Sequence, residues 1–229
     1  MRIVDLSQEI FQGMPVYQGH LRTVIWEHEG HAETAERFEG GFSFQSRGLM
    51  LCDHGPTHVD ALSHLDPADD AATIDEMDLS QFFGPGTCLD VSAAGPHEYI
   101  GADALEAAVE ADGAEVRPGD VLLLCTGTYN RVGGTRAYTT DYPGFDESAA
   151  EWLLKSGVKI FGVDSPSPDN PISRTYPVHM MCRREGITHY ENLAQLEQLV
   201  GKRFTFHGLP LKIRAGTGSP VRAIAVLEE

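Results

Sequence analysis

The sequence contains few cysteines and no long apolar run. Its four cysteines include no C-x-x-C pair, and a chain of 229 residues needs no disulfide to stabilise a core, so reduced thiols are expected. The longest notable apolar run, residues 121–125, is far shorter than the ~20 residues that cross a bilayer. No apolar leader or cleavage site opens the chain. We therefore expect a cytoplasmic protein without a membrane span.

Basic residues are also scarce, since 17 lysines and arginines accompany 34 acidic residues and the formal net charge is −17. Nucleic-acid binding requires clustered basic side chains that neutralise phosphates, so this composition argues against a nucleic-acid partner. A small-molecule substrate fits better. With 41% hydrophobic residues, the chain can bury one sizeable core. We predict a single domain over residues 1–229.

Strand-like segments lie at both ends of the chain. Residues 2–6, 23–27 and 42–51 are short, bounded by turn residues and rich in β-branched, aromatic or other apolar side chains, which predicts strands. Residues 204–227 have the same character, and the Gly- and Pro-containing segment at 216–220 is expected to interrupt them.

Helices are predicted in the middle of the chain. One begins at Ala102 and ends near Gly113, a second runs from a cap at Asp146 to Gly157, and a third runs from Pro177 to about Arg184. The second helix separates two apolar strands, residues 120–125 and 158–163, as in a βαβ crossover. The sequence thus predicts an α/β fold in which a mixed sheet has helices packed outside it.

Four polar groups occur close together in the pattern H-x-x-x-H-x-D-x-x-x-H, which runs from His54 to His64. Imidazole and carboxylate groups suit zinc or manganese. A helix, with its ~100° step, would separate the first two histidines from the other two groups. In an extended chain all four positions share one face, although a straight strand would spread them over roughly 33 Å. The chain must therefore bend, and Gly55-Pro56 supplies a bend. A lone histidine is more often structural, but four groups in register predict a metal site.

The segment resembles the H-x-G-T-H-x-D-x-P-x-H signature of the cyclase family of metal-dependent hydrolases, which includes bacterial kynurenine formamidase and isatin hydrolase. Further matching segments follow in order: Asp5–Ser7 with Met14-Pro15, Gly119–Leu123 with Thr126-Gly127, Gly162–Asp169, and Leu209–Lys212 with Gly218–Ala223. The resemblance implies a swivelling β/β/α arrangement and a homodimer or homotetramer. Pro56 and Leu62 depart from the signature, which indicates a subfamily with its own substrate.

The resemblance also implies the ligands of one or two divalent ions, zinc first and manganese as the alternative. His54, His58 and Asp60 match the ligands of a first ion, and Asp60 would bridge to a second. His179 and Glu191 match the remaining ligands of the second ion.

His64 matches the catalytic histidine of the family. The implied reaction is hydrolysis of an amide, a cyclic amide or a lactone by a metal-activated water, with His64 moving the proton. Two alternatives stay open. One is a metal-assisted lactonase or dehydratase that acts on a sugar-acid derivative, and the other is a non-catalytic ligand-binding module of the same fold.

Two further hypotheses concern residues outside the H-x-x-x-H-x-D-x-x-x-H pattern. His189 is a rival ligand for the second ion, although its flanking residues do not match the family. Phe11, Tyr17 and Phe44 could stack on an aromatic substrate, whereas core packing is the ordinary role of such side chains.

Overall fold

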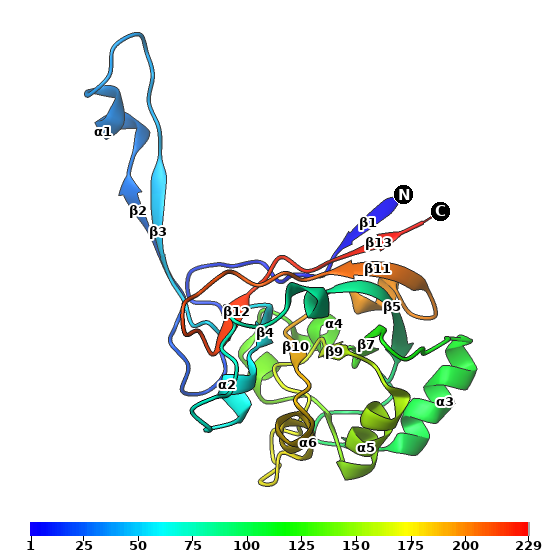
Figure 1. Cartoon of the computed structure of the whole chain (residues 1–229). Helices are drawn as coiled ribbons and strands as arrows, with labels where there is room; N and C mark the ends of the chain where they lie inside the picture. The colour runs from blue at the N-terminus through cyan, green and yellow to red at the C-terminus, as the bar shows by residue number, and fades with distance from the viewer. Residues whose placement is uncertain (229) are drawn as a thin grey trace.

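The computed structural model describes residues 1–228, and its largest element is a nine-stranded mixed sheet (Figure 1). Its central strands are parallel, and the strands on either side of them pair antiparallel. This arrangement confirms the predicted α/β class. In spatial order the strands are β1 (Arg2–Asp5), β13 (Ile224–Leu227), β11 (Arg203–His207), β5 (Phe83–Asp90), β7 (Val121–Cys125), β9 (Ile160–Val163), β10 (His189–Glu191), β4 (His58–Asp60) and β12 (Gly218–Pro220).

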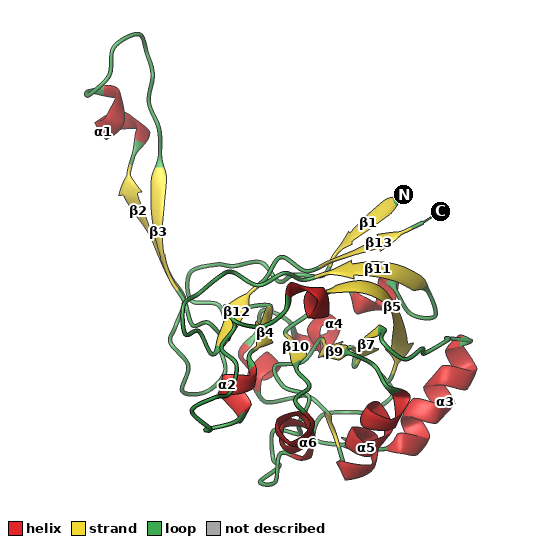
Figure 2. Cartoon of the chain, in the orientation of Figure 1, coloured by secondary structure: helices red, strands yellow, loops and turns green. Residues whose placement is uncertain are grey.

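Three helices pack against one face of this sheet: α3 (Ala102–Asp112), α5 (Glu147–Ser156) and α6 (Pro177–Glu185) (Figure 2). All three were predicted. Each ends at a glycine in the left-handed conformation, and the Asp146 carboxylate accepts a hydrogen bond from the Ala149 N–H at the start of α5. Within residues 1–228, none of the helices is long and apolar enough to span a bilayer.

The sheet separates two apolar cores. In β7, Leu122 and Leu124 pack toward the helices, whereas Val121 and Leu123 pack on the opposite face. This alternation follows the period of two along a strand. Because both faces are covered, β7 is a continuous apolar run. The predicted βαβ crossover is confirmed, since β7 and β9 are parallel neighbours joined through α5.

The smaller elements lie around the sheet. They are α1 (His31–Ala35), α2 (Leu62–Leu65), α4 (Thr128–Val132), the 3₁₀ helices Leu79–Phe82, Arg136–Thr139 and Leu196–Gln198, the parallel pair β6 (Tyr99–Ile100) and β8 (Gly144–Phe145), and the antiparallel pair β2 (Val24–Glu29) and β3 (Ser46–Met50). One expectation was wrong. Residues 218–220, predicted as part of a break, form strand β12 at the edge of the sheet, where β4 supplies the pairing partner.

The pair β2–β3, with α1 at its far end, forms an arm over residues 24–50 that projects away from the sheet (Figure 1). Of the strand predicted over residues 42–51, only residues 46–50 form a strand in the structure, and this strand is β3. Large apolar side chains are exposed along the arm: Trp26, Phe38, Phe42, Leu49 and Met50. The arm therefore contributes little to the two cores of the body.

Candidate active site

Strand β4 carries two of the predicted metal ligands. It is buried between β10 and β12. His58 and Asp60 alternate with Val59, whose side chain belongs to the apolar core. A strand alternates its side chains between faces, so the two polar residues point away from that core on the same side. A register shift of one residue would bury Val59's neighbours in the core and expose the valine to the site.

Strand β10 repeats the arrangement opposite β4. Glu191 is the Cα partner of His58, and Tyr190 is the partner of Val59. The Tyr190 ring lies in the core, where its hydroxyl donates to the Gly208 carbonyl oxygen at 2.9 Å. His189 and Glu191, on either side of this tyrosine, therefore face the same side as the polar residues of β4.

The single extended face predicted for residues 54–64 is wrong, because only residues 58–60 are a strand. The chain turns before this strand, and His64 lies in the short helix α2. The bends nevertheless bring the four groups together. The His54 ring centroid is 4.0 Å from that of His64 and 5.3 Å from that of His58.

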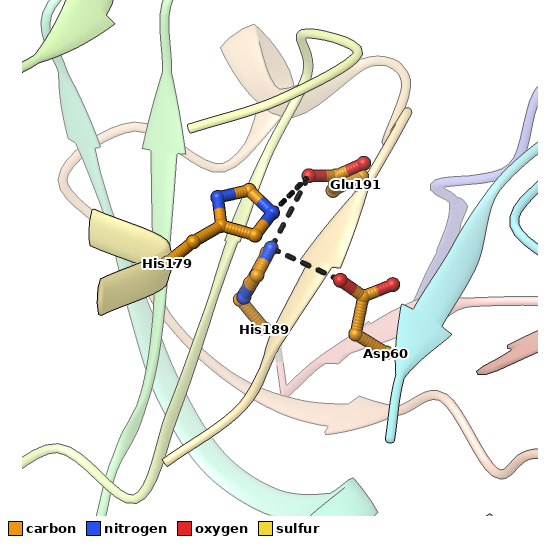
Figure 3. Close-up of side chains that lie close together, drawn as sticks. All are labelled: Asp60, His179, His189 and Glu191. Carbon is orange, nitrogen blue, oxygen red and sulfur yellow. Dashed lines mark hydrogen bonds and ion pairs between the residues drawn. The ribbon is translucent and has the colours of Figure 1, made fainter. Parts of the chain in front are cut away.

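Two groups of side chains in the structure could each hold a metal ion. In both groups the candidate ligand atoms lie within 4.8 Å of one another: His54, His58 and Asp60 form the first, and Asp60, His179, His189 and Glu191 form the second. Figure 3 shows the second group around a common centre. Asp60 belongs to both. The structure thus gathers every predicted ligand, and it adds His189, the rival candidate.

A buried nitrogen shows whether these residues fit a metal ion. His58 Nε2 is buried without a hydrogen bond of good geometry among residues 1–228, 3.3 Å from Asp60 Oδ1 and 3.4 Å from Glu191 Oε2. His189 Nε2 lies 3.2 Å from Glu191 Oε1 and 3.5 Å from Asp60 Oδ2. Nitrogen lone pairs and carboxylate oxygens directed at one volume are the donor set of a divalent transition metal. The residues present therefore fit such an ion.

The electrostatics also favour a cation. Burial opposes ionisation of Asp60, but the His54 and His58 rings beside it hold the pKa of its carboxyl well below the usual range. Burial likewise opposes ionisation of Glu191, whose pKa is lowered to about 2 by His189 and His58. Burial alone would lower the pKa of His58, yet the two carboxylates raise it to about 10. Two buried carboxylates thus stay ionised and require positive charge beside them.

His64 differs from these groups. Its side chain is 35% exposed, whereas that of Asp60 is 1% exposed, and its Nε2 lies 3.9 Å from Asp60 Oδ2. Burial lowers the pKa of His64, and the nearby His54 and His179 add to the effect while Asp60 opposes it. A neutral imidazole at the edge of the site can accept a proton at neutral pH.

Asp169 is a site residue whose role the sequence did not show. Its buried carboxylate accepts hydrogen bonds from the N–H groups of Val178, at 2.9 Å, and His179, at 3.1 Å, at the start of α6. It also contacts His179 Nδ1, which leaves Nε2 of that ring facing Glu191 at 3.7 Å. Carboxylates in this outer position orient ligating histidines in metalloproteins.

A cavity of about 370 Å³ opens directly onto the site. Its lining includes four polar side chains of the site, His54, His64, His179 and Glu191, and also apolar or aromatic side chains: Tyr17, Leu65 and Met180. None of its lining residues within residues 1–228 is Lys or Arg. Of the three aromatic residues considered for stacking, Tyr17 alone lines this cavity. Phe11 lines a different pocket, and Phe44 lies on the arm with its ring centroid 5.9 Å from that of Phe38.

Known proteins resemble this chain in sequence and in fold. The Cyclase family matches residues 4–170. A kynurenine formamidase from Salinibacter ruber is 30% identical over 98% of this chain and 97% of that protein. An isatin hydrolase from Roseibium aggregatum is 29% identical over 78% of this chain and 73% of that protein. Among solved structures, an isatin hydrolase bound to the product analogue thioisatinate has a TM-score of 0.86 at 25% identity, covering 99% of this chain and 92% of that one.

Proposed function

Because the chain belongs to the cyclase family, we propose that it is a metal-dependent hydrolase that cleaves the carbon–nitrogen bond of an amide or cyclic amide, or opens a lactone. One observation carries this proposal. Asp60 is shared by two groups of candidate ligands that lie beside a cavity of about 370 Å³. This arrangement supports the proposal, because a metal ion held by these groups would lie beside a substrate in the cavity.

We assign a first ion to His54, His58 and Asp60, and a second to Asp60, His179 and Glu191. His189 Nε2 is a further nitrogen within reach of the second position, 3.5 Å from Asp60 Oδ2. Imidazole and carboxylate donors accept both zinc and manganese. We propose zinc as the first choice and manganese as the alternative.

A divalent ion at this centre supplies a Lewis acid that polarises a carbonyl group and makes water a competent nucleophile at neutral pH. The chain's own residues do the rest. His64 takes the proton from the attacking water through its neutral imidazole and returns it to the leaving nitrogen or oxygen. Tyr17, Leu65 and Met180 give the substrate an apolar surface to contact beside the reacting groups.

Among residues 1–228, the cavity lining contains no Lys or Arg to pair with an anionic group, which supports binding of an uncharged amide or lactone group in the cavity. Two of the relatives are named kynurenine formamidase and isatin hydrolase. We therefore propose an arylformamidase-like activity on an aromatic amide or cyclic amide.

We further propose a cytoplasmic homodimer or homotetramer. The four free cysteines agree with a reducing compartment. The arm supports self-association, because an isolated two-stranded ribbon is marginally stable in water and this one exposes large apolar side chains. In such an oligomer, a second copy of the chain would cover the apolar side chains that the arm exposes.

Elemental analysis and a substrate panel test the function together. Protein purified without chelator should contain one or two equivalents of zinc or manganese per chain. It should hydrolyse N-formylkynurenine, isatin or a lactone, and a chelator should abolish the activity. His54→Ala removes a proposed ligand of the first ion, so this variant should contain less metal than the wild-type chain. Metal-free protein that gains no activity on addition of zinc or manganese would refute the proposal, and turnover of a sugar-acid lactone alone would replace the amide assignment.

A further inference from the structure

His54 presents a different ring nitrogen to the site from its neighbours. Its Nδ1 lies 2.8 Å from Asp60 Oδ1. In His58, His179 and His189, by contrast, Nε2 faces the carboxylates, and Nδ1 faces outward to a backbone carbonyl, a carboxylate or a thiol. The two kinds of histidine therefore need opposite tautomers to offer a lone pair to an ion.

The outer side of His54 is held by two residues. His54 Nε2 lies 3.0 Å from Thr217 Oγ1, and that hydroxyl donates to Asp53 Oδ2 at 2.8 Å. The Thr217 N–H donates to the same carboxylate oxygen at 3.2 Å. A hydroxyl has one proton to donate, and here the carboxylate accepts it. Thr217 Oγ1 can therefore only accept a proton from His54, so Nε2 must be the protonated nitrogen.

The protonation of Nε2 fixes the inner nitrogen as well. A neutral His54 ring with its proton on Nε2 carries the lone pair on Nδ1, directed at Asp60 Oδ1. Two lone pairs at 2.8 Å repel each other unless positive charge lies beside them. A metal ion that accepts both lone pairs removes this conflict.

The backbone around Thr217 is fixed to the same strand that carries the ligands. The Ala61 N–H, next to Asp60, donates to the Thr217 carbonyl oxygen at 2.8 Å. Gly218, the Cα partner of Asp60, leaves room for the His54 ring, since a Cβ there would lie 2.8 Å from His54 Cε1. The hydroxyl of Thr217 is therefore held at a set position relative to the site.

We propose that Asp53 and Thr217 are positioning residues that hold His54 as the tautomer protonated on Nε2, so that His54 binds the ion through Nδ1. This role rests on the proposed metal centre. Outer hydrogen-bond partners of ligating histidines contribute about 10–100-fold to metal affinity in other proteins.

Zinc affinity, measured by competition with a chromophoric chelator, tests this role. Thr217→Val removes the hydroxyl at nearly constant shape and should weaken zinc binding about 10–100-fold. Thr217→Ser keeps the hydroxyl and should restore affinity to within a few-fold. Thr87→Val is the matched control, because the Thr87 hydroxyl is bonded to the Lys202 carbonyl oxygen in another part of the sheet. Wild-type affinity in Thr217→Val would overturn the proposal.

Nitrogen NMR of the His54 ring provides a readout that a merely structural role would not change. In the zinc-loaded protein, Nε2 should carry the proton and Nδ1 should show the shift of a metal-bound nitrogen. Metal bound to Nε2 would overturn the inference. If the wild-type chain binds no zinc, the proposed function fails. Zinc bound through Nε2, or an unchanged zinc affinity in Thr217→Val, would instead refute only the role of Thr217.

Discussion

The wall formed by β4 and β10 buries ionisable side chains, whereas the arm exposes large apolar ones. Asp60 is 1% exposed and His189 is fully buried, while Phe42 is 60% exposed and Leu49 is 54% exposed. Folded proteins ordinarily distribute these residue types the other way round. The wall and the arm thus depart from the usual distribution in opposite directions.

Each departure costs stability in the isolated chain. Buried charges lose hydration unless they are paired, and exposed apolar surface stays in contact with water. Under the proposed function, a cation bound by the wall and an apolar protein surface along the arm would offset these costs. The comparison supports the proposal that the wall serves the chemistry and the arm serves assembly, and the variants below test that division.

Asp60→Asn should have the largest effect, because this carboxylate belongs to both ligand groups. An amide is a poor ligand for a divalent cation, so both ions should be lost and turnover should fall about 10⁴-fold. Elemental analysis and initial rates measure the two effects. Asp66→Asn, which changes the carboxylate beside Arg183 on the outer surface, is the matched control. Full metal content in Asp60→Asn would contradict the shared-ligand assignment.

His64→Ala should separate proton transfer from metal binding within the wall. Metal content should stay at the wild-type level, since His54, His58 and Asp60 remain. Turnover should fall by roughly 10²–10⁴-fold, the usual contribution of a positioned general acid–base. His207→Ala, in β11, controls for loss of an imidazole elsewhere. A variant with a lower melting temperature but near-normal turnover would show that His64 only orders the loop.

Glu191→Gln should affect the second ion alone. The first group keeps its three ligands, so the chain should retain one ion while turnover falls about 10²-fold. His189→Ala, analysed beside it, decides whether His189 is a ligand or a neighbour, because only a ligand should lower the metal count when removed. An unchanged metal count and rate in Glu191→Gln would leave a mononuclear site built on the first group.

Phe42→Ser should have the smallest effect on the chemistry and should act on assembly instead. Loss of a buried phenylalanine at an interface weakens association by roughly 1.5–3 kcal/mol, about 10–100-fold in the dissociation constant. The melting temperature of the dissociated chain should barely change. Sedimentation velocity measures the shift toward smaller species, with the exposed Tyr99→Ser outside the arm as the control. A monomeric wild-type chain would refute the role of the arm in self-association.

Local signals in the sequence predicted the elements that local chemistry specifies. Asp146, Gly113 and Gly157 bound their helices as expected, because side-chain caps and left-handed glycines act over a few residues. The first ligand group was equally visible, since its three members lie within residues 54–60. Even there the predicted extended face was wrong, because the bends around β4 depend on contacts with β10 and β12.

The parts that the sequence did not show depend on pairing between distant segments. His189 becomes a neighbour of Asp60 only because β10 lies beside β4, and Asp169 reaches His179 only through the packing of α6. The projection of the arm was not predicted either. The composition of β2 and β3 is that of ordinary short strands. It does not show that these two strands pair with each other and project away from the main sheet.

The pairing of β4 with β10 also has a consequence for the order in which the protein would acquire the two proposed ions. The three residues of the first ligand group lie within residues 54–60, so an unfolded chain already offers them together to a metal. The second group exists only after residues 58–60 pair with residues 189–191, a contact of high sequence separation that an unfolded chain does not offer. An ion that also binds the unfolded chain stabilises the native state less than its affinity suggests. We therefore expect the second ion to supply most of the stabilisation by metal, and the first to accompany the chain from its unfolded state.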